Sequence, residues 1–289
     1  MRSRVTDFIN RRIPVTMTRM HADFSPPDSL DAVRIAALSG AAATVDIRTV
    51  ASTGSTNADL MAAAQADALT RPTLLAAQMQ TAGRGRAGRV WHTAPGAALT
   101  FSLAWKFHCP LQHLAGLPLA VGATLAAALA ALGQPVQLKW PNDLLLDGAK
   151  LGGILIEIAG GKHAGDATWA VIGIGLNLAL PEALRSQVNG ASATALLAIE
   201  REQLLATLLD RLAEALLEFE RDGFAAFAPR WNACHAYADR AVRILDQGKI
   251  LQQGVAVGVD EGGRLLLDTD AGRIAVSAGD VSLRLLEQD

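Results

Sequence analysis

A run of alternating glycine and arginine constrains the fold of this chain more than any other stretch. It spans residues 83–89, reads GRGRAGR, and is followed by Trp91. Glycine lets the backbone adopt positive φ and come close to a ligand, at an entropic cost. Arginine offers a planar fork that pairs with carboxylate or phosphate through two parallel hydrogen bonds. Because strand-like segments flank the run, we predict a loop that closes over an anion. An RGG-like nucleic-acid segment or a plain surface loop is the alternative.

Length and charge narrow the class of protein. The 289 residues, 51% of them hydrophobic, predict one large domain or one large and one small domain with an ample core. A net charge of −2 and a pI near 6.3 argue against a partner that is nucleic acid. The N-terminus lacks the apolar core of a signal peptide, and the apolar run at 117–132 is too short to span a bilayer comfortably. These features predict a cytoplasmic protein with no membrane partner.

The cysteines and histidines supply no recognisable catalytic or metal motif. Cys109 and Cys234 form no C-x-x-C pair, which favours a reducing compartment over a disulfide framework or zinc ribbon. His108, Cys109 and His113 are close in sequence but lack metal-site spacing. No G-x-S-x-G segment is present, and neither cysteine has an evident base partner.

Hydrophobic periodicity changes along the chain and predicts three parts. Residues 1–44 are an extension with at most one short helix, near Asp31–Leu38. In residues 45–237 apolar strand-like segments combine with helices, of which 200–221 is the strongest because leucines recur at three and four positions. Residues 238–289 contain short strands separated by glycine-containing turns, a spacing that predicts a small closed β-barrel.

Polar residues at the ends of three predicted strands indicate a site. Lys139, Asn142 and Asp143 surround a Trp-Pro corner at which a strand stops, although an ordinary hairpin turn would have the same composition. Lys150 precedes two glycines in the next strand, and Asn177 ends a strand that contains the sequence GIGLN. Glycines inside strands mark a close backbone approach. Neither a dinucleotide fingerprint nor a P-loop is present.

This combination of arginine, lysine and glycine without a nucleophile favours one chemistry. A substrate carboxylate is ionised at neutral pH and can attack phosphorus without a general base. Catalysis then consists of orienting two anions and neutralising the charge that develops on phosphate. The sequence therefore predicts activation of a carboxylate by ATP, assisted by Mg²⁺.

Three motifs carry a resemblance to a known family. The segments GRGRAGRVW, KWPNDLLLDGAKLGGILIE and GIGLN occur in this order before the small β domain. Together they resemble the bacterial biotin protein ligases (biotin–[acetyl-CoA-carboxylase] ligases) over residues 45–289. The resemblance implies an α/β (α+β) fold with a class II synthetase-like mixed sheet and flanking helices, followed by an SH3-like β-barrel. It also implies that ATP and biotin give biotinyl-5′-AMP. The biotinyl group then passes to a lysine of the biotin carboxyl carrier protein of acetyl-CoA carboxylase.

The resemblance also implies roles for individual residues. Catalytic roles fall to Arg84, Lys150 and Asp143, with Asp143 orienting the acceptor amine or accepting its proton. Biotin would contact Ser55, Thr56, Asn57, Gln80, Gly83, Arg84, Arg86, Lys150, Gly153 and Gly173. ATP or the adenylate would contact Arg84, Arg86, Arg89, Trp91, Lys139, Asn142, Lys150 and Asn177. No metal ligand is assigned with certainty, and the Mg²⁺ that accompanies ATP would lie near Asn177.

Two features depart from the family pattern. After the loop the family usually has W-x-S-P-x-G-x-N-L, whereas residues 91–99 read WHTAPGAAL, so contacts at the loop's exit can differ. Bifunctional members carry a winged helix-turn-helix domain before the catalytic part. Residues 1–44 are too few for such a domain, so we expect a ligase without repressor activity, with Met17 or Met20 as an alternative start.

Other functions stay open at this stage. A lipoate or octanoate ligase has the same fold, but typically shows an R-R-x-S-G-G-G loop that this sequence lacks. A biotin-sensing DNA-binding regulator would need a basic recognition helix, and none is visible. A homodimer is one option for the assembly, which the sequence does not determine.

Overall fold

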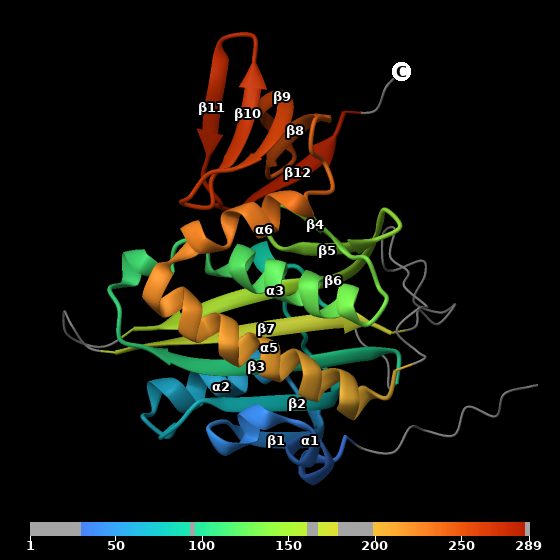
Figure 1. Ribbon diagram of the computed structural model, residues 1–289, viewed down its shortest axis with the longest axis vertical. Helices are drawn as coiled ribbons and strands as arrows, with labels where there is room; N and C mark the ends of the chain where they lie inside the picture. The colour runs from blue at the N-terminus through green and yellow to red at the C-terminus, as the bar shows by residue number, and fades with distance from the viewer. Residues whose placement is uncertain (1–29, 93–95, 161–166, 179–198, 287–289) are drawn as a thin grey trace, which may run out of the picture.

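The first part of the chain forms a seven-stranded mixed sheet in the computed structural model, which describes residues 30–92, 96–160, 167–178 and 199–286 (Figure 1). The strands lie in the order β1-β2-β3-β7-β6-β5-β4. Only β1 and β2 are parallel, and every other neighbouring pair is antiparallel. The strands are β1 (Asp46–Thr53), β2 (Thr73–Gln80), β3 (Ala98–Phe107), β4 (Gln137–Lys139), β5 (Asp143–Leu146), β6 (Ala149–Ala159) and β7 (Thr168–Asn177).

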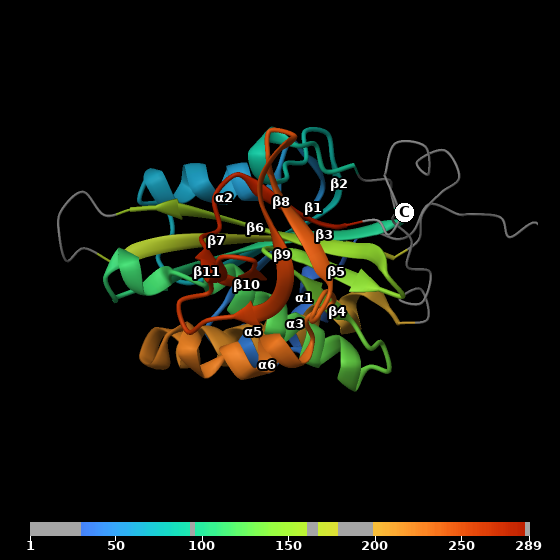
Figure 2. The same cartoon turned by 90° about the horizontal axis from the view of Figure 1, so that it is seen from above.

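Helices cover both faces of this sheet, so its central strands are buried on both sides (Figure 2). One face carries α2, and the opposite face carries α1, α3 and α5. The α-helices are α1 (Ala32–Leu38), α2 (Thr56–Gln65), α3 (Leu117–Ala131), α5 (Arg201–Asp222) and α6 (Ala228–Ala233). The 3₁₀ turns are η1 (Gly40–Ala43), η2 (Arg86–Gly88), η3 (Leu111–Leu114) and η5 (Phe224–Ala226).

Helix α3 is the apolar run seen in the sequence. The helical stretch Leu111–Ala131 has the length and mean hydropathy, 1.9, of a membrane span, but 61% of it is buried inside the protein. Its alanines and leucines face the sheet on one side and α5 on the other. The burial shows that this apolar run forms a core helix.

The last part of the chain is a five-stranded antiparallel sheet in the order β11-β10-β9-β8-β12. Its strands are β8 (Ala241–Asp246), β9 (Lys249–Val259), β10 (Leu265–Thr269), β11 (Gly272–Val276) and β12 (Val281–Leu285). Among the described residues, the hydrogen-bonded ladder ends at β11 and β12 and does not join them. The antiparallel sheet agrees with the expected fold class, while the residue pattern alone had suggested a closed ring of strands.

The larger of two hydrophobic core clusters among the described residues joins the two sheets. Buried residues of the C-terminal sheet, among them Val242, Leu265 and Leu283, belong to the same cluster as the core under α3 and α5. The indole of Trp140 is fully buried and donates a hydrogen bond to the Gly263 carbonyl at 3.2 Å. The segment after α6 also bonds to β4 through backbone groups.

The helices predicted at 31–38 and 200–221 occur within one residue of these bounds as α1 and α5, but β5 and α6 were not predicted. Strand β5 is only four residues long and begins directly after the Asn-Asp pair, whose composition is typical of a turn. Helix α6 is a short six-residue segment, too brief to show a helical period. Residues 1–29, with Met17 and Met20, and residues 93–95 of the altered segment lie outside the described residues.

Candidate ligand-binding site

The glycine-arginine run folds back on itself beside the sheet. The Gly85 N–H donates to the Arg89 carbonyl at 2.7 Å, and the Trp91 N–H donates to the Gly83 carbonyl at 2.9 Å. A Cβ at Gly83 would lie 2.4 Å from the Trp91 carbonyl oxygen, so a side chain there would break the turn. Gly88 has φ of +69°, which favours glycine. The glycines thus allow a narrow turn that presents its arginines to one side.

This turn closes a cavity of about 130 Å³ over the sheet. Its walls come from α2, β2, β3, β5, β6, β7 and residues 84–91. The sequence-predicted residues that line it are Ser55, Thr56, Asn57, Gln80, Arg84, Arg86, Arg89, Trp91, Asn142, Asp143, Lys150, Gly153 and Gly173. Residues more than a hundred positions apart therefore meet in one cavity, as the motifs predicted. No histidine or cysteine is among its described lining residues.

One end of the cavity is a buried hydroxyl and amide cluster. Ser55 caps α2 by accepting a hydrogen bond from the Ala58 N–H at 3.4 Å. The Thr56 N–H and hydroxyl donate to Gln80 Oε1 at 2.8 and 3.1 Å. The Thr56 and Ser102 hydroxyls are 2.8 Å apart. Ser102 was not predicted, and its signal was a hydroxyl inside the otherwise largely apolar strand β3, which also contains Thr100. The helix cap therefore also fixes polar groups that face the cavity.

Glu157 anchors two of the predicted residues and was also missed. Its Oε2 accepts hydrogen bonds from Arg84 Nη2 at 2.7 Å and from Asn57 Nδ2 at 2.5 Å. The Asn57 Oδ1 is buried and has no hydrogen-bond partner in the described structure. A Cβ at Gly173 would lie 2.6 Å from that oxygen, which explains glycine at this point of β7. The arrangement leaves one buried amide acceptor unpaired beside Gly173 among the described residues.

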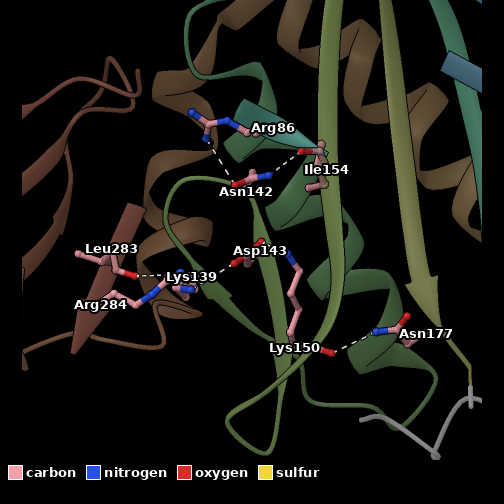
Figure 3. A network of polar contacts seen from close by, with 9 residues as sticks. All are labelled: Arg86, Lys139, Asn142, Asp143, Lys150, Ile154, Asn177, Leu283 and Arg284. Carbon is pink, nitrogen blue, oxygen red and sulfur yellow. Dashed lines mark hydrogen bonds and ion pairs between the residues drawn. The ribbon is translucent and has the colours of Figure 1, made fainter. Parts of the chain in front are cut away.

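Asp143 lies between two lysines at the other end of the cavity (Figure 3). Its Oδ1 is 2.6 Å from Lys150 Nζ, and its Oδ2 is 3.2 Å from Lys139 Nζ. Burial opposes ionisation of Asp143, but the charges of the two ammonium groups outweigh it, so the pKa of the carboxyl is lowered. Burial lowers the pKa of Lys139, although Asp143 counteracts this. The cluster thus has one carboxylate with a cation on either side.

Trp91 packs flat against the glycines of β6 and β7. A Cβ at Gly175 would lie 2.4 Å from Trp91 Cε2, and one at Gly153 would lie 3.5 Å from Trp91 Cζ3. The Lys150 ammonium is 5.8 Å from the ring centroid, within the range of a cation–π contact. The Trp91 Nε1 is buried without a partner in the described residues. The two strand glycines therefore make room for the indole.

Three predicted residues lie outside this cavity. Gly83 lines the neighbouring larger cavity, and Lys139 lines a small one beside β12. Asn177 is buried, and its Nδ2 donates to the Lys150 carbonyl at 3.3 Å. Asn177 thus supports the strand that carries Lys150 in this structure.

Arg86 connects the glycine-arginine turn to both sheets. Its Nη1 is 3.4 Å from Asn142 Oδ1, and its Nη2 donates to the Gly279 carbonyl. Burial lowers the pKa of Arg86, while Asp280 and Asp143 oppose that shift. A cavity of about 1110 Å³ opens on this side, between the turn, the start of α3 and the turns of the C-terminal sheet.

Comparisons with known proteins identify the family. Residues 50–177 match the biotin/lipoate A/B protein ligase family, and residues 238–284 match the biotin protein ligase C-terminal domain. The biotin–[acetyl-CoA-carboxylase] ligase of Mycobacterium tuberculosis is 35% identical over 80% of this chain and 86% of that protein. The chain belongs to the biotin protein ligase family.

Two further relatives extend the comparison. The bifunctional ligase/repressor BirA of Escherichia coli is 38% identical over 73% of this chain, and the match covers 66% of that protein's length. The biotin protein ligase of Aquifex aeolicus, solved in complex with biotin and ATP, superposes with a TM-score of 0.68 at 28% identity. That match covers 83% of this chain and 99% of the Aquifex chain.

Proposed function

We propose that this chain is an ATP-dependent, AMP-forming biotin ligase. It joins biotin and ATP to biotinyl-5′-AMP and then transfers the biotinyl group to one lysine of the biotin carboxyl carrier protein of acetyl-CoA carboxylase. The observation that carries the proposal is the cavity in which Arg84, Arg86 and Lys150 meet the buried hydroxyl and amide cluster. Relatives named as biotin ligases, and a structural neighbour that holds biotin and ATP, support the same reaction.

The hydroxyl and amide end of the cavity suits the polar ring of biotin. A cyclic urea presents one carbonyl acceptor and two N–H donors. Ser55, Thr56 and Gln80 offer hydroxyl, amide and backbone groups of both kinds, and the buried Asn57 Oδ1 is an acceptor without a partner in the described part of the chain. Because buried polar groups must be paired, a ligand that satisfies them gains both affinity and specificity.

The opposite end of the cavity suits the reacting phosphate. Arg86, Arg89 and Lys150 line the cavity beside Asn142 and Asp143, and they would neutralise the charge that develops as the carboxylate attacks phosphorus. Arg84, which Glu157 holds on the Asn57 side, would add its charge from the turn. The carboxylate oxygen forms a bond to the α-phosphorus, and pyrophosphate leaves with the electrons of the broken bond. Trp91, Asn142 and the turn itself would then exclude water from the mixed anhydride.

Magnesium is expected with ATP rather than as a resident ion. Among the described ranges, no group of three or more His, Cys, Asp or Glu side chains is arranged to hold a metal. Mg²⁺ commonly binds through substrate phosphates with few protein ligands, which fits this cavity. When bound, it would supply charge neutralisation on the phosphates. Asn177 remains the proposed neighbour of the ion, although its amide bonds to the Lys150 carbonyl here.

The acceptor and the cellular setting are further proposals. The larger cavity shares Arg84, Arg86 and Arg89 with the ligand cavity, so an acceptor lysine could reach the anhydride through it. We also keep as predictions a catalytic domain at 45–237, a C-terminal domain at 238–289, a cytoplasmic location, a possible assembly as a homodimer, and no nucleic-acid or membrane partner.

Biotin-dependent exchange between ATP and pyrophosphate, run with Mg²⁺ beside lipoate and octanoate, tests the first step. Labelling of a carrier domain, read by avidin blot, tests the second, with a carrier whose acceptor lysine is replaced by arginine as the control. Exchange with lipoate but not with biotin would favour the lipoate ligase alternative, which the family match at 50–177 also includes. Labelling of the arginine carrier would contradict transfer to one lysine.

A further inference from the structure

Asp143 bonds to two cations among the described residues, and of these Lys150 lines the ligand cavity whereas Lys139 does not. Lys150 lines the ligand cavity, whereas Lys139 lines a cavity of about 20 Å³ between β4 and β12 and is absent from the wall of the ligand cavity. The Lys139 side chain is 12% exposed, compared with 34% for Lys150. Figure 3 shows the two ammonium groups approaching the carboxylate from different sides.

The proposed reaction requires Lys150 to change partner. If Lys150 binds the oxygens of the adenylate, its ammonium group is drawn away from Asp143. The Asp143 side chain is only 16% exposed, and a buried carboxylate without a cation tends to take up a proton. A protonated Asp143 could neither accept a proton nor orient an ammonium group. A second cation that does not bind the ligand would prevent this.

We propose that Lys139 is a positioning residue that keeps Asp143 ionised and in place while Lys150 binds the adenylate. The inference rests on the proposed ligase function and replaces the expectation that Lys139 contacts the nucleotide. Lys139 donates to Asp143 Oδ2, so Oδ1 is left for the acceptor once Lys150 has turned away. Lys139 acts on the acceptor only through the carboxylate.

The transfer step can then be written in full. The ammonium group of the acceptor lysine gives one proton to Asp143, and the lone pair of the resulting amine attacks the biotinyl carbonyl carbon. A C–N bond forms, the C–O bond to phosphate breaks, and AMP leaves with that electron pair. The second proton of the nitrogen passes to solvent and leaves a neutral amide. Lys139 keeps its charge throughout.

Several other charged or titratable groups surround Asp143. Burial lowers the pKa of Lys139, and the charge of Arg284 on β12 lowers it further. Burial raises the pKa of Tyr237, and the charge of Asp143 adds to that shift. The groups that interact with Asp143 are Lys139 on β4, Lys150 on β6, Arg86 in η2 and Tyr237 after α6, and Arg284 on β12 acts on Lys139 and Tyr237. Lys139 and Lys150 are the two that bond directly to Asp143 among these groups.

The test compares the two half-reactions of Lys139→Met across pH. Single-turnover transfer from preformed biotinyl-AMP to a carrier domain is followed from pH 5 to pH 8, beside biotin-dependent pyrophosphate exchange. Because an opposite charge nearby shifts a carboxyl pKa by about 1–3 units, we expect the acidic limb of the transfer profile to move up by about one unit. Transfer at pH 6 should fall more than exchange does.

Controls separate this role from simpler ones. Lys139→Arg should keep the acidic limb of the transfer profile at the parental pH. Lys139→Gln, which keeps a hydrogen-bond donor without charge, should not. Lys106→Met, on the exposed side of β3, is the matched control and should leave the profile in place. An unchanged acidic limb in Lys139→Gln, or a raised KM for ATP without a pH shift, overturns the proposal. A parent protein without biotin-dependent exchange would instead refute the proposed function.

Discussion

The contact between Trp91 and β7 predicts a strong effect of one added methyl group. A Cβ at Gly175 would lie 2.4 Å from Trp91 Cε2, 2.5 Å from Cζ2 and 2.7 Å from Nε1. Carbon atoms in ordinary contact lie about 3.5–4.0 Å apart, so Gly175→Ala requires the indole to move by about 1 Å. Overpacking costs about 1–3 kcal/mol, and we expect about 1 kcal/mol because Trp91 belongs to a turn that can shift.

Gly153 on the adjacent strand is the matched control, because it faces the same indole. A Cβ there would lie 3.5 Å from Trp91 Cζ3, which is ordinary contact. Gly153→Ala should therefore change the free energy of unfolding by less than about 0.5 kcal/mol. Urea unfolding of both variants, with the slope of the transition checked for constancy, gives the comparison.

A double-mutant cycle identifies the cause. Trp91→Ala removes the ring that the new methyl group would meet, so Gly175→Ala should cost little in that background. The expected coupling is about 1 kcal/mol, well above the error of additivity for independent sites. If the two costs simply add, or if Gly153→Ala destabilises the protein as much as Gly175→Ala does, the steric explanation is wrong.

Three further changes probe the contact between α5 and η1, a buried histidine and the glycine-arginine turn. Asp210→Ala removes the acceptor for the Ser39 hydroxyl and two N–H groups of η1, so it should lower stability in thermal unfolding by about 2 kcal/mol. The exposed Asp222→Ala is the control, and equal losses would refute this. Burial lowers the pKa of His235 to about 4 from 6.5, so between these pH values the unfolded chain takes up a proton that the folded chain excludes. The free energy of unfolding should therefore fall by about 2 kcal/mol from pH 7 to pH 5. His235→Phe should abolish that part of the loss, measured by urea unfolding at each pH. A variant that keeps the parental pH dependence would disprove the role of His235. Arg84→Ala should release the acyl-adenylate at least about tenfold faster, since hydrogen bonds to charged groups contribute about 1.5–3 kcal/mol. Labelled adenylate retained on filters as tightly as by the parent would rule out a closing turn.

The fold could be predicted where the residue pattern is local. Residues 200–221 show their helical character in the spacing of their own leucines, and the structure places α5 at Arg201–Asp222. The capping of α2 by Ser55 can likewise be predicted from the residues next to it in the sequence. Strand β5 could not be predicted, because its four residues are held by pairing with β4 and β6 and not by their own periodicity.

The candidate site shows the same difference between contacts that are local in sequence and contacts between distant segments. Lys150 and Asp143 were grouped correctly because they are seven positions apart in one motif. Glu157 was missed because its partner Arg84 is 73 positions away, and Ser102 is 46 positions from Thr56. A single sequence contains no signal for such pairings. The same strands could be arranged in several orders, and only some of these orders bring the paired residues together. The structure supplies the order of strands, and with it the side chains that share a wall.

The hydrogen bond between Trp140 and Gly263 has a consequence for the order of synthesis. The indole N–H is fully buried and its partner lies 123 positions later in the chain. Protein domains generally begin to fold from the N-terminal end while the ribosome is still adding residues. Until residues near 263 have emerged, the first sheet has a polar group in its core without a partner and an apolar edge without a cover. The first sheet therefore reaches its final burial, with this N–H paired, only after the last sheet has been synthesised.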